Sequence, residues 1–176
     1  MSRPAWEGEP VRLVDPDPGW TAHGERERDQ IETLLAPWLV GRIEHVGSTA
    51  VPGLPAKPIH DLQALVPNLA DAQSIAAALA PHDWHYVDPD LDGRPWRRFY
   101  VKVVDGRRSA HLHVMTPGTP RWRQQIAFRD ALRADPALAA DYARLKRALA
   151  AVHGHDREAY STGKDDFVAT VLATLF

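Results

Sequence analysis

The sequence predicts an α+β fold, in which a mixed β-sheet with flanking helices is followed by a C-terminal helical tail. Short β-prone segments alternate with helical ones up to about residue 118, whereas the remaining residues have apolar side chains at helical spacing. Asp105-Gly106 separates two β-prone runs, as in a two-residue hairpin turn. The length of 176 residues fits one domain. We therefore expect a single domain, residues 1–176, with a core over about 11–118 and a tail over about 119–176 packed on it.

Periodicity and turn residues give the expected elements in order. A first helix is expected over residues 20–35, after the turn cluster at 15–19. Strands are expected over 43–46, 59–66, 84–87, 97–104 and 109–115, with a helix over 69–79 between the second and third. The tail is expected to form helices over 121–133, 138–152 and 160–175.

The expected hairpin determines which side chains share a face of the sheet. A two-residue turn at Asp105-Gly106 pairs Arg98 with His113 and Tyr100 with His111. The opposite face is then apolar and holds Phe99, Val101, Ala110 and Leu112. This register predicts that Arg98 lies beside the two histidines. Arg107 and Arg108, at the tip, are interpreted as solubilising residues.

Composition excludes several classes of function. The chain has 21 Lys and Arg against 23 Asp and Glu, a balance that argues against nucleic acid as a partner. Cysteine is absent, which excludes disulfides and thiolate metal sites. No apolar window is long enough for a membrane span, and residues 1–10 lack the apolar core of a signal peptide. We therefore expect a cytoplasmic protein with no membrane partner.

The most informative stretch is residues 44–62, EHVGSTAVPGLPAKPIHDL. An expected strand leads into Gly47-Ser48 and a proline-rich loop, and the next strand carries Asp61. Small residues at a strand end let backbone N–H groups approach a phosphate, and the Ser48 hydroxyl can add a hydrogen bond. Asp61 could hold a divalent metal ion that bridges phosphate oxygens. The structural alternative is a tight loop with Asp61 as a capping residue.

These residues resemble the GrpB family, within the DNA polymerase beta-like nucleotidyltransferase superfamily. The resemblance rests on EHVGSTAVPGL at 44–54 and AKPI at 56–59, with weaker matches at 111–114, Tyr142…Lys146 and Tyr160…Lys164…Phe167. It implies a minimal nucleotidyltransferase-like fold, Ser48 and Asp61 at a catalytic centre, and Mg²⁺ or Mn²⁺ as cofactor. Some GrpB-like domains are fused to dephospho-coenzyme A kinase, so the resemblance also suggests a link to coenzyme A synthesis.

The chain departs from the superfamily at one position. The transferases usually carry two carboxylates on a strand, separated by one residue. Here Asp61 is the first of them, and Gln63 stands at the position of the second. An amide is a poor ligand for a hard cation. His111 or His113 could take the place of a third acid near Asp61, and such a His pair can bind Zn, Ni or Fe(II). Alternatively, the two imidazoles are only hydrogen-bonded partners on the sheet.

Basic residues complete the expected anion site. Gly47 and Ser48 would hold the phosphates, and Lys57, Arg98, Lys146 and Lys164 would offset their charge. Lys57 lies on the stiff loop, and Lys164 is in line with the apolar stripe of the last helix. For Lys146, the alternative is a stem that lies over aromatic surface with its amine in solvent.

Three functions remain open from the sequence. The first is metal-dependent transfer of a nucleotidyl group, acting on a nucleotide or another phosphorylated small molecule. The second is a catalytically weak or inactive module that binds a nucleotide or anion, which Gln63 favours. The third is a metal-dependent hydrolase based on the two histidines.

Overall fold

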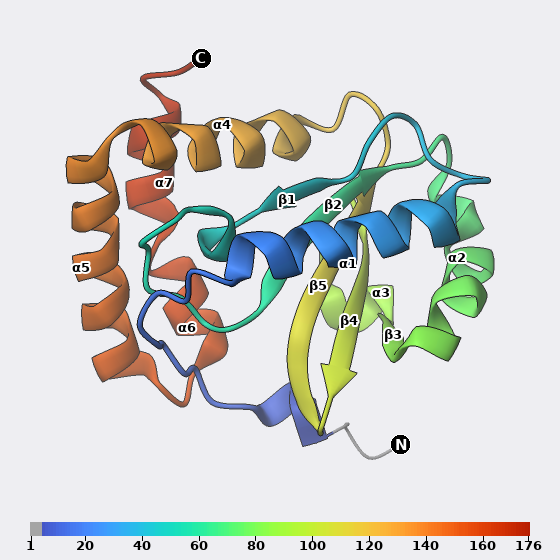
Figure 1. The fold of residues 1–176 in the computed structure, drawn as a ribbon, viewed down its shortest axis with the longest axis horizontal. Coiled ribbons are helices and arrows are strands. Elements are labelled where there is room, and N and C mark those ends of the chain that lie inside the picture. Colours follow the sequence, from blue (N-terminus) through green and yellow to red (C-terminus); the bar gives the residue numbers. More distant parts are fainter. Residues whose placement is uncertain (1–4) are drawn as a thin grey trace.

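The computed structural model describes residues 5–176, and within them a five-stranded mixed sheet is flanked by helices (Figure 1). The strands are β1 (Glu44–Val46), β2 (His60–Leu65), β3 (Trp84–Val87), β4 (Arg98–Val104) and β5 (Arg107–Met115). The helices are α1 (Trp20–Leu35), α2 (Ala72–Leu79), α3 (Pro89–Asp92), α4 (Pro120–Ala134), α5 (Pro136–His153), α6 (Arg157–Thr162) and α7 (Asp165–Leu172). The predicted α+β class with a mixed sheet is confirmed.

The strand order is β1-β2-β5-β4-β3, and only the central pair, β2 and β5, is parallel. In this pair Asp61 lies opposite His111 and Gln63 lies opposite His113. The other pairs are antiparallel, and β4 and β5 form the hairpin expected at Asp105-Gly106. Both turn residues have positive φ, 50° and 73°, as a tight two-residue hairpin turn requires.

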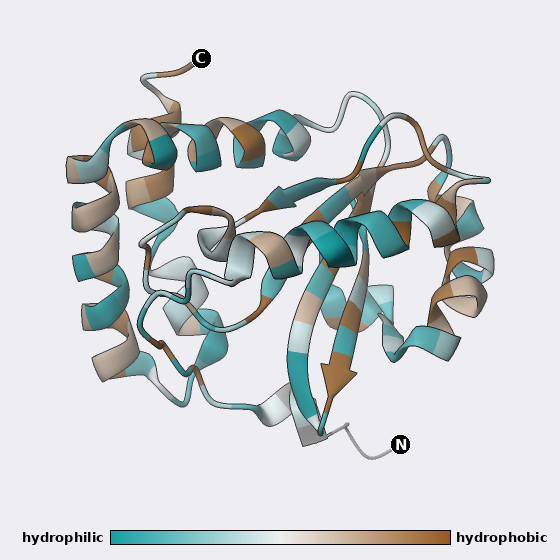
Figure 2. Cartoon of the chain, viewed as in Figure 1, coloured by the Kyte–Doolittle hydropathy of each residue, from teal (hydrophilic) through white to brown (hydrophobic). Residues whose placement is uncertain are grey.

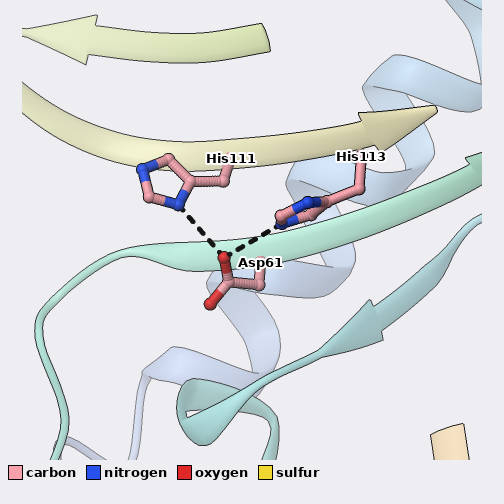
Figure 3. Close-up of side chains that lie close together, drawn as sticks. All are labelled: Asp61, His111 and His113. Atoms are coloured by element: carbon pink, nitrogen blue, oxygen red, sulfur yellow. Dashed lines mark hydrogen bonds and ion pairs between the residues drawn. The ribbon is translucent and has the colours of Figure 1, made fainter. Parts of the chain in front are cut away.

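The two faces of the sheet have different coverings. Helices α1 and α2 pack on one face through a buried apolar cluster that includes Ile31, Leu62, Ile75 and Leu112. Figure 2 shows α1 coloured mainly hydrophilic, with hydrophobic positions recurring along it. The other face carries Asp61, His111 and His113 (Figure 3), and α4 covers its β1–β2 end. Within the described residues, each helix is too short or too polar to cross a lipid bilayer.

The hairpin register differs from the prediction. The pairs next to the turn are as expected, but the register shifts by one residue between Lys102 and Val103, where β5 contains a bulge. Beyond the bulge His113 lies opposite Phe99 and His111 lies opposite Val101. The prediction that Arg98 lies opposite His113 is therefore wrong. Arg98 lies opposite Val114, and by strand alternation it is on the other face of the sheet from the histidines.

The tail also differs in one element. The helix expected over residues 160–175 is two helices, α6 and α7, separated at Gly163 and Lys164. A Cβ at Gly163 would lie 2.5 Å from Leu149 Cδ2 in α5, so the chain is tightly packed there. Asp135 and Asp156 cap α5 and α6 by accepting hydrogen bonds from backbone N–H groups of their first turns.

Candidate functional site

A pocket of about 660 Å³ lies between the second face of the sheet and the helical tail. Gly47, Ser48, Lys57, Asp61, His111, His113 and Lys164, all predicted from the sequence, line it. Arg98 does not, and instead it lines a shallow depression with Leu69 and Tyr86. Its place beside His113 is taken by the preceding residue, Arg97, because the bulge reverses the faces of β4 relative to the prediction.

The Gly47-Ser48 turn lies directly against Asp61. Gly47 has φ 74° and ψ −174°, a conformation that essentially only glycine adopts. A Cβ at this position would lie 2.6 Å from Asp61 Oδ2, so a glycine is also required by space. Strand β1 pairs Val46 with Asp61 and thereby sets this close approach.

Three side chains from the central strands point toward one another: Asp61, His111 and His113 (Figure 3). We call them the Asp61–His111–His113 cluster. Asp61 Oδ1 is 3.2 Å from His111 Nδ1 and 3.4 Å from His113 Nε2. Partial burial acts to raise the pKa of Asp61, but the hydrogen bonds with both imidazoles hold that pKa well below its usual value. Burial lowers the pKa of His111 to about 4 and also lowers that of His113, so both rings are neutral at pH 7.

The cluster has the donor set of a transition-metal site. One atom from each of Asp61, His111 and His113 lies within 4.8 Å of the other two. Ligands bonded at about 2.1 Å to a tetrahedral ion lie about 3.4 Å apart, close to the two distances that involve Asp61 Oδ1. Two imidazoles and one carboxylate suit Zn²⁺, Fe²⁺, Ni²⁺ or Mn²⁺ better than Mg²⁺, which prefers oxygen ligands.

Gln63 does not contribute to the pocket. It shares a face with Asp61, as predicted, but it is fully buried under α4, where its amide donates to the Trp122 carbonyl at 3.0 Å. The position of a second carboxylate in the transferases is therefore covered by protein here.

Lys146 is buried beneath the Gly47-Ser48 turn rather than extended into solvent. Its side chain is 2% exposed, and Nζ donates to Ser48 Oγ at 2.6 Å and to the Pro55 carbonyl. Burial, followed by the charges of Lys164 and Lys57, lowers the pKa of Lys146 to about 6. Because the Ser48 oxygen accepts a hydrogen bond from Lys146, the Ser48 hydroxyl proton can point toward the pocket.

Lys57 and Lys164 approach the same aromatic ring. Their Nζ atoms lie 5.3 Å and 4.6 Å from the ring centre of Tyr160, which is buried. Burial and then the Lys164 charge lower the pKa of Lys57 to about 7, and burial lowers that of Lys164. Lys57 is thus a half-buried amine at the pocket wall.

The lining has a strong excess of positive charge. Among the described residues it contains eight Lys and Arg side chains and four Asp and Glu side chains, although the whole chain has a net charge of −2. Sequence reasoning missed most of these cations, including Arg97, Arg108, Arg121, Arg129 and Arg157. Arg108, interpreted as solubilising, is half-buried with its guanidinium over Trp6 at 5.1 Å. No local pattern indicated its 3.4 Å contact with His111, because residues three apart on a regular strand lie on opposite faces.

The family model described as GrpB protein matches residues 10–174. The chain belongs to the GrpB family. UPF0157 protein PA4798 of Pseudomonas aeruginosa is 40% identical over 165 residues, covering 92% of this chain and 66% of that protein. The crystal structure of the conserved protein GrpB from Enterococcus faecalis superposes with a TM-score of 0.79 at 28% identity, over 91% of this chain and 94% of that chain.

Some of the curated relatives are longer than this chain. The chain is 31% identical to a dephospho-CoA kinase of Mycolicibacterium paratuberculosis, over 89% of this chain but 44% of that protein. The chain thus spans about half to two thirds of the first curated relatives that it matches. A cytoplasmic RNA terminal U-transferase aligns with 76% of the chain at a TM-score of 0.44 and 12% identity, which is too distant to inform function.

Proposed function

We propose that the chain binds a nucleotide or another phosphorylated small molecule in its basic pocket, together with one divalent metal ion held by Asp61, His111 and His113. The observation that carries this proposal is the position of the three ligand atoms in the wall of a pocket with an excess of Lys and Arg. An ion at that place would face the space that a phosphate would occupy. It would supply Lewis-acid polarisation of a phosphate oxygen.

The protein side chains would have distinct tasks in binding. Ser48, oriented by Lys146, would donate its hydroxyl proton to a phosphate oxygen. Lys57 and Lys164, which also line the pocket, would offset the phosphate charge. The positive φ of Gly47 keeps the chain close to Asp61 without a side chain between them.

Binding is better supported than two-metal nucleotidyl transfer. That reaction places two cations between paired carboxylates, and the residue at the second position, Gln63, is buried against Trp122.

The donor set favours a second candidate, hydrolysis of a phosphate ester, because two imidazoles and one carboxylate leave coordination positions open for water. Dephospho-coenzyme A belongs among the ligands to be tested, since a longer relative is named as its kinase.

Calorimetry on the metal-free full chain tests the proposal. We expect Zn²⁺ or Mn²⁺ to bind more tightly than Mg²⁺, and nucleotides or dephospho-coenzyme A to bind more tightly with the metal than without it. Asp61→Asn should abolish the metal effect and leave the circular dichroism spectrum unchanged. Asp141→Asn, on the exposed surface of α5, is the matched control and should behave as wild type.

Two outcomes would contradict the proposal. Metal affinity that is the same in Asp61→Asn and wild type would remove the metal site from this cluster. No binding of any phosphorylated ligand, with metal present, would remove the phosphate pocket. Release of phosphate or pyrophosphate from a labelled nucleotide would move the assignment from binding to catalysis.

A further inference from the structure

Each imidazole of the cluster lies between Asp61 and an arginine. His113 uses Nε2 toward Asp61, and its other nitrogen, Nδ1, contacts Arg97 Nη1. His111 uses Nδ1 toward Asp61, and its Nε2 is 3.4 Å from Arg108 Nη1. The nitrogens that would bind a metal therefore face inward, and the outer nitrogens face guanidinium groups.

The chemistry of arginine fixes the protons on these rings. A guanidinium group only donates hydrogen bonds, so an imidazole nitrogen that it contacts must accept. A neutral imidazole with an accepting outer nitrogen carries its proton on the inner nitrogen, from which it donates to Asp61. A metal-bound imidazole needs the opposite arrangement, with the outer N–H donating to a carboxylate, a carbonyl or water.

Arg97 is held in its position by several contacts. Its Nε donates to Asp92 Oδ2 at 2.9 Å, and Nη2 donates to Asp92 Oδ1. Its guanidinium carbon lies 4.1 Å from the ring centre of Phe99, and the residue is 8% exposed. Arg108 donates from Nε to the Trp6 carbonyl at 3.1 Å. Other contacts therefore fix the guanidinium group of each arginine beside its histidine.

We propose that Arg97 and Arg108 keep both histidines in the tautomer that does not bind a metal, so that the cluster binds an ion weakly by itself and tightly together with an anionic ligand. Both arginines line the pocket, so a phosphate bound next to the metal ion would offer their N–H groups a new acceptor. The rings then shift their protons to the outer nitrogens and remain neutral. This inference rests on the proposed function and adds that metal and phosphate binding are strongly and reciprocally coupled.

Nitrogen-15 NMR of the histidine side chains in the metal-free full chain tests the tautomers directly. We expect the proton on Nε2 in His113 and on Nδ1 in His111. Adding Zn²⁺ with pyrophosphate should move both protons to the other ring nitrogen. A proton on His113 Nδ1 in the metal-free protein would overturn the inference, whether or not any nucleotide binds. A failure of the proposed function alone would leave these metal-free tautomers as expected.

Zn²⁺ titrations of arginine variants test the consequence. Arg97→Met removes the donor, and the affinity for Zn²⁺ alone should rise about tenfold, the lower end of effects seen for groups behind metal ligands. Arg94→Met removes a charge from the same lining without a contact to His113, and it also removes a partner of Asp92, so it controls for both of these side effects of Arg97→Met. Pyrophosphate should raise Zn²⁺ affinity less in Arg97→Met than in wild type.

Equal gains in Zn²⁺ affinity for Arg97→Met and Arg94→Met would overturn the inference. Arg97→Met leaves Asp92 with a weaker partner, so the same titration of Arg108→Met provides a second test on the His111 side. A rise for Arg108→Met above the Arg94→Met control supports the inference, and no rise contradicts it.

Discussion

Gly47 combines an unusual backbone conformation with a lack of space for any side chain. We expect Gly47→Ala to lose about 1–3 kcal/mol of unfolding free energy because of its φ and ψ. It should also weaken Zn²⁺ binding, because the new Cβ would displace the Asp61 carboxylate. Urea unfolding and Zn²⁺ titration measure the two effects.

Gly53→Ala is the matched control for this change. Gly53 also has positive φ, 78°, but a Cβ there meets nothing within 4 Å. We expect a loss of about 1–2 kcal/mol in stability and unchanged Zn²⁺ affinity. Equal Zn²⁺ affinities in the two variants would show that Gly47 matters for the backbone only.

Lys57 and Lys146 give phosphate binding a pH dependence. Lys57 and Lys146 have their pKa values lowered to about 7 and about 6, by burial first and then by neighbouring charges that include Lys164. Arg157 and Arg108 also lower the Lys57 pKa, Arg147 also lowers the Lys146 pKa, and Asp61 opposes both shifts. A bound phosphate favours the charged amines and so raises both pKa values. Binding therefore takes up protons, and affinity should fall as the pH rises through this range.

Calorimetry of nucleotide binding at about pH 8, in two buffers of different ionisation enthalpy, measures this proton uptake. At that pH the phosphate group is already fully ionised, since its second pKa is about 6. Lys146→Met should take up fewer protons than wild type. An affinity that is independent of pH would contradict the participation of both lysines.

At the scale of single elements, Arg129 fastens helix α4 to strand β1. Its Nη1 donates to Glu44 Oε2 at 2.7 Å and to the His45 carbonyl at 2.9 Å, and the residue is buried. We expect Arg129→Met to lower the unfolding free energy by about 1.5–3 kcal/mol, the range for hydrogen bonds with charged groups. Arg144→Met, on the exposed side of α5, should change it by less than about 1 kcal/mol. Urea unfolding of both variants decides, and equal effects would contradict the role of Arg129.

Local signals predicted most elements. Helix α1 and strand β3 begin and end where the sequence predicts, because turn residues and apolar spacing are local properties. The bulge in β5 has no such signal, and this one extra residue moved Arg98 away from the site and Arg97 into it. The break between α6 and α7 depends on the approach of Leu149 to Gly163, which lies outside any local pattern.

The candidate site was predictable to a similar extent. Sequence spacing and the family resemblance brought Ser48, Asp61, His111 and His113 into one pocket, and the structure places them there. The arginines behind the imidazoles could not be found this way. Arg97 contacts Asp92 in α3 and Arg108 contacts Trp6 in the N-terminal segment, and neither contact leaves a local signal in the sequence.

At the scale of the whole molecule, the core and the tail share a second apolar cluster. Val51 and Leu54 from the loop after β1 pack with Leu132, Tyr142 and Ala143 from α4 and α5. The backbone of Val11 also donates to the Gly154 carbonyl at 2.8 Å. We therefore expect residues 5–176 to unfold as one cooperative unit.

Native-state hydrogen exchange tests this expectation. The slowest amides of α5 and of β2 should report the same free energy of opening, equal to that of global unfolding. Exchange of α5 through a lower-energy opening, with β2 still protected, would show instead that the tail unfolds separately.

The distances along the chain between site residues have a consequence for synthesis. Asp61 and His111 are 50 positions apart, and Ser48 and Lys146 are 98 apart. The ribosome adds about 5–20 residues per second, so Lys146 is synthesised roughly 5–20 s after Ser48. A nascent chain that ends before β5 lacks both histidines, and one that ends before α5 lacks the amine beneath Ser48. Under the proposed function, a metal ion and a phosphate ester would meet a complete site only after translation has also passed Lys164, which lines the pocket beyond α5.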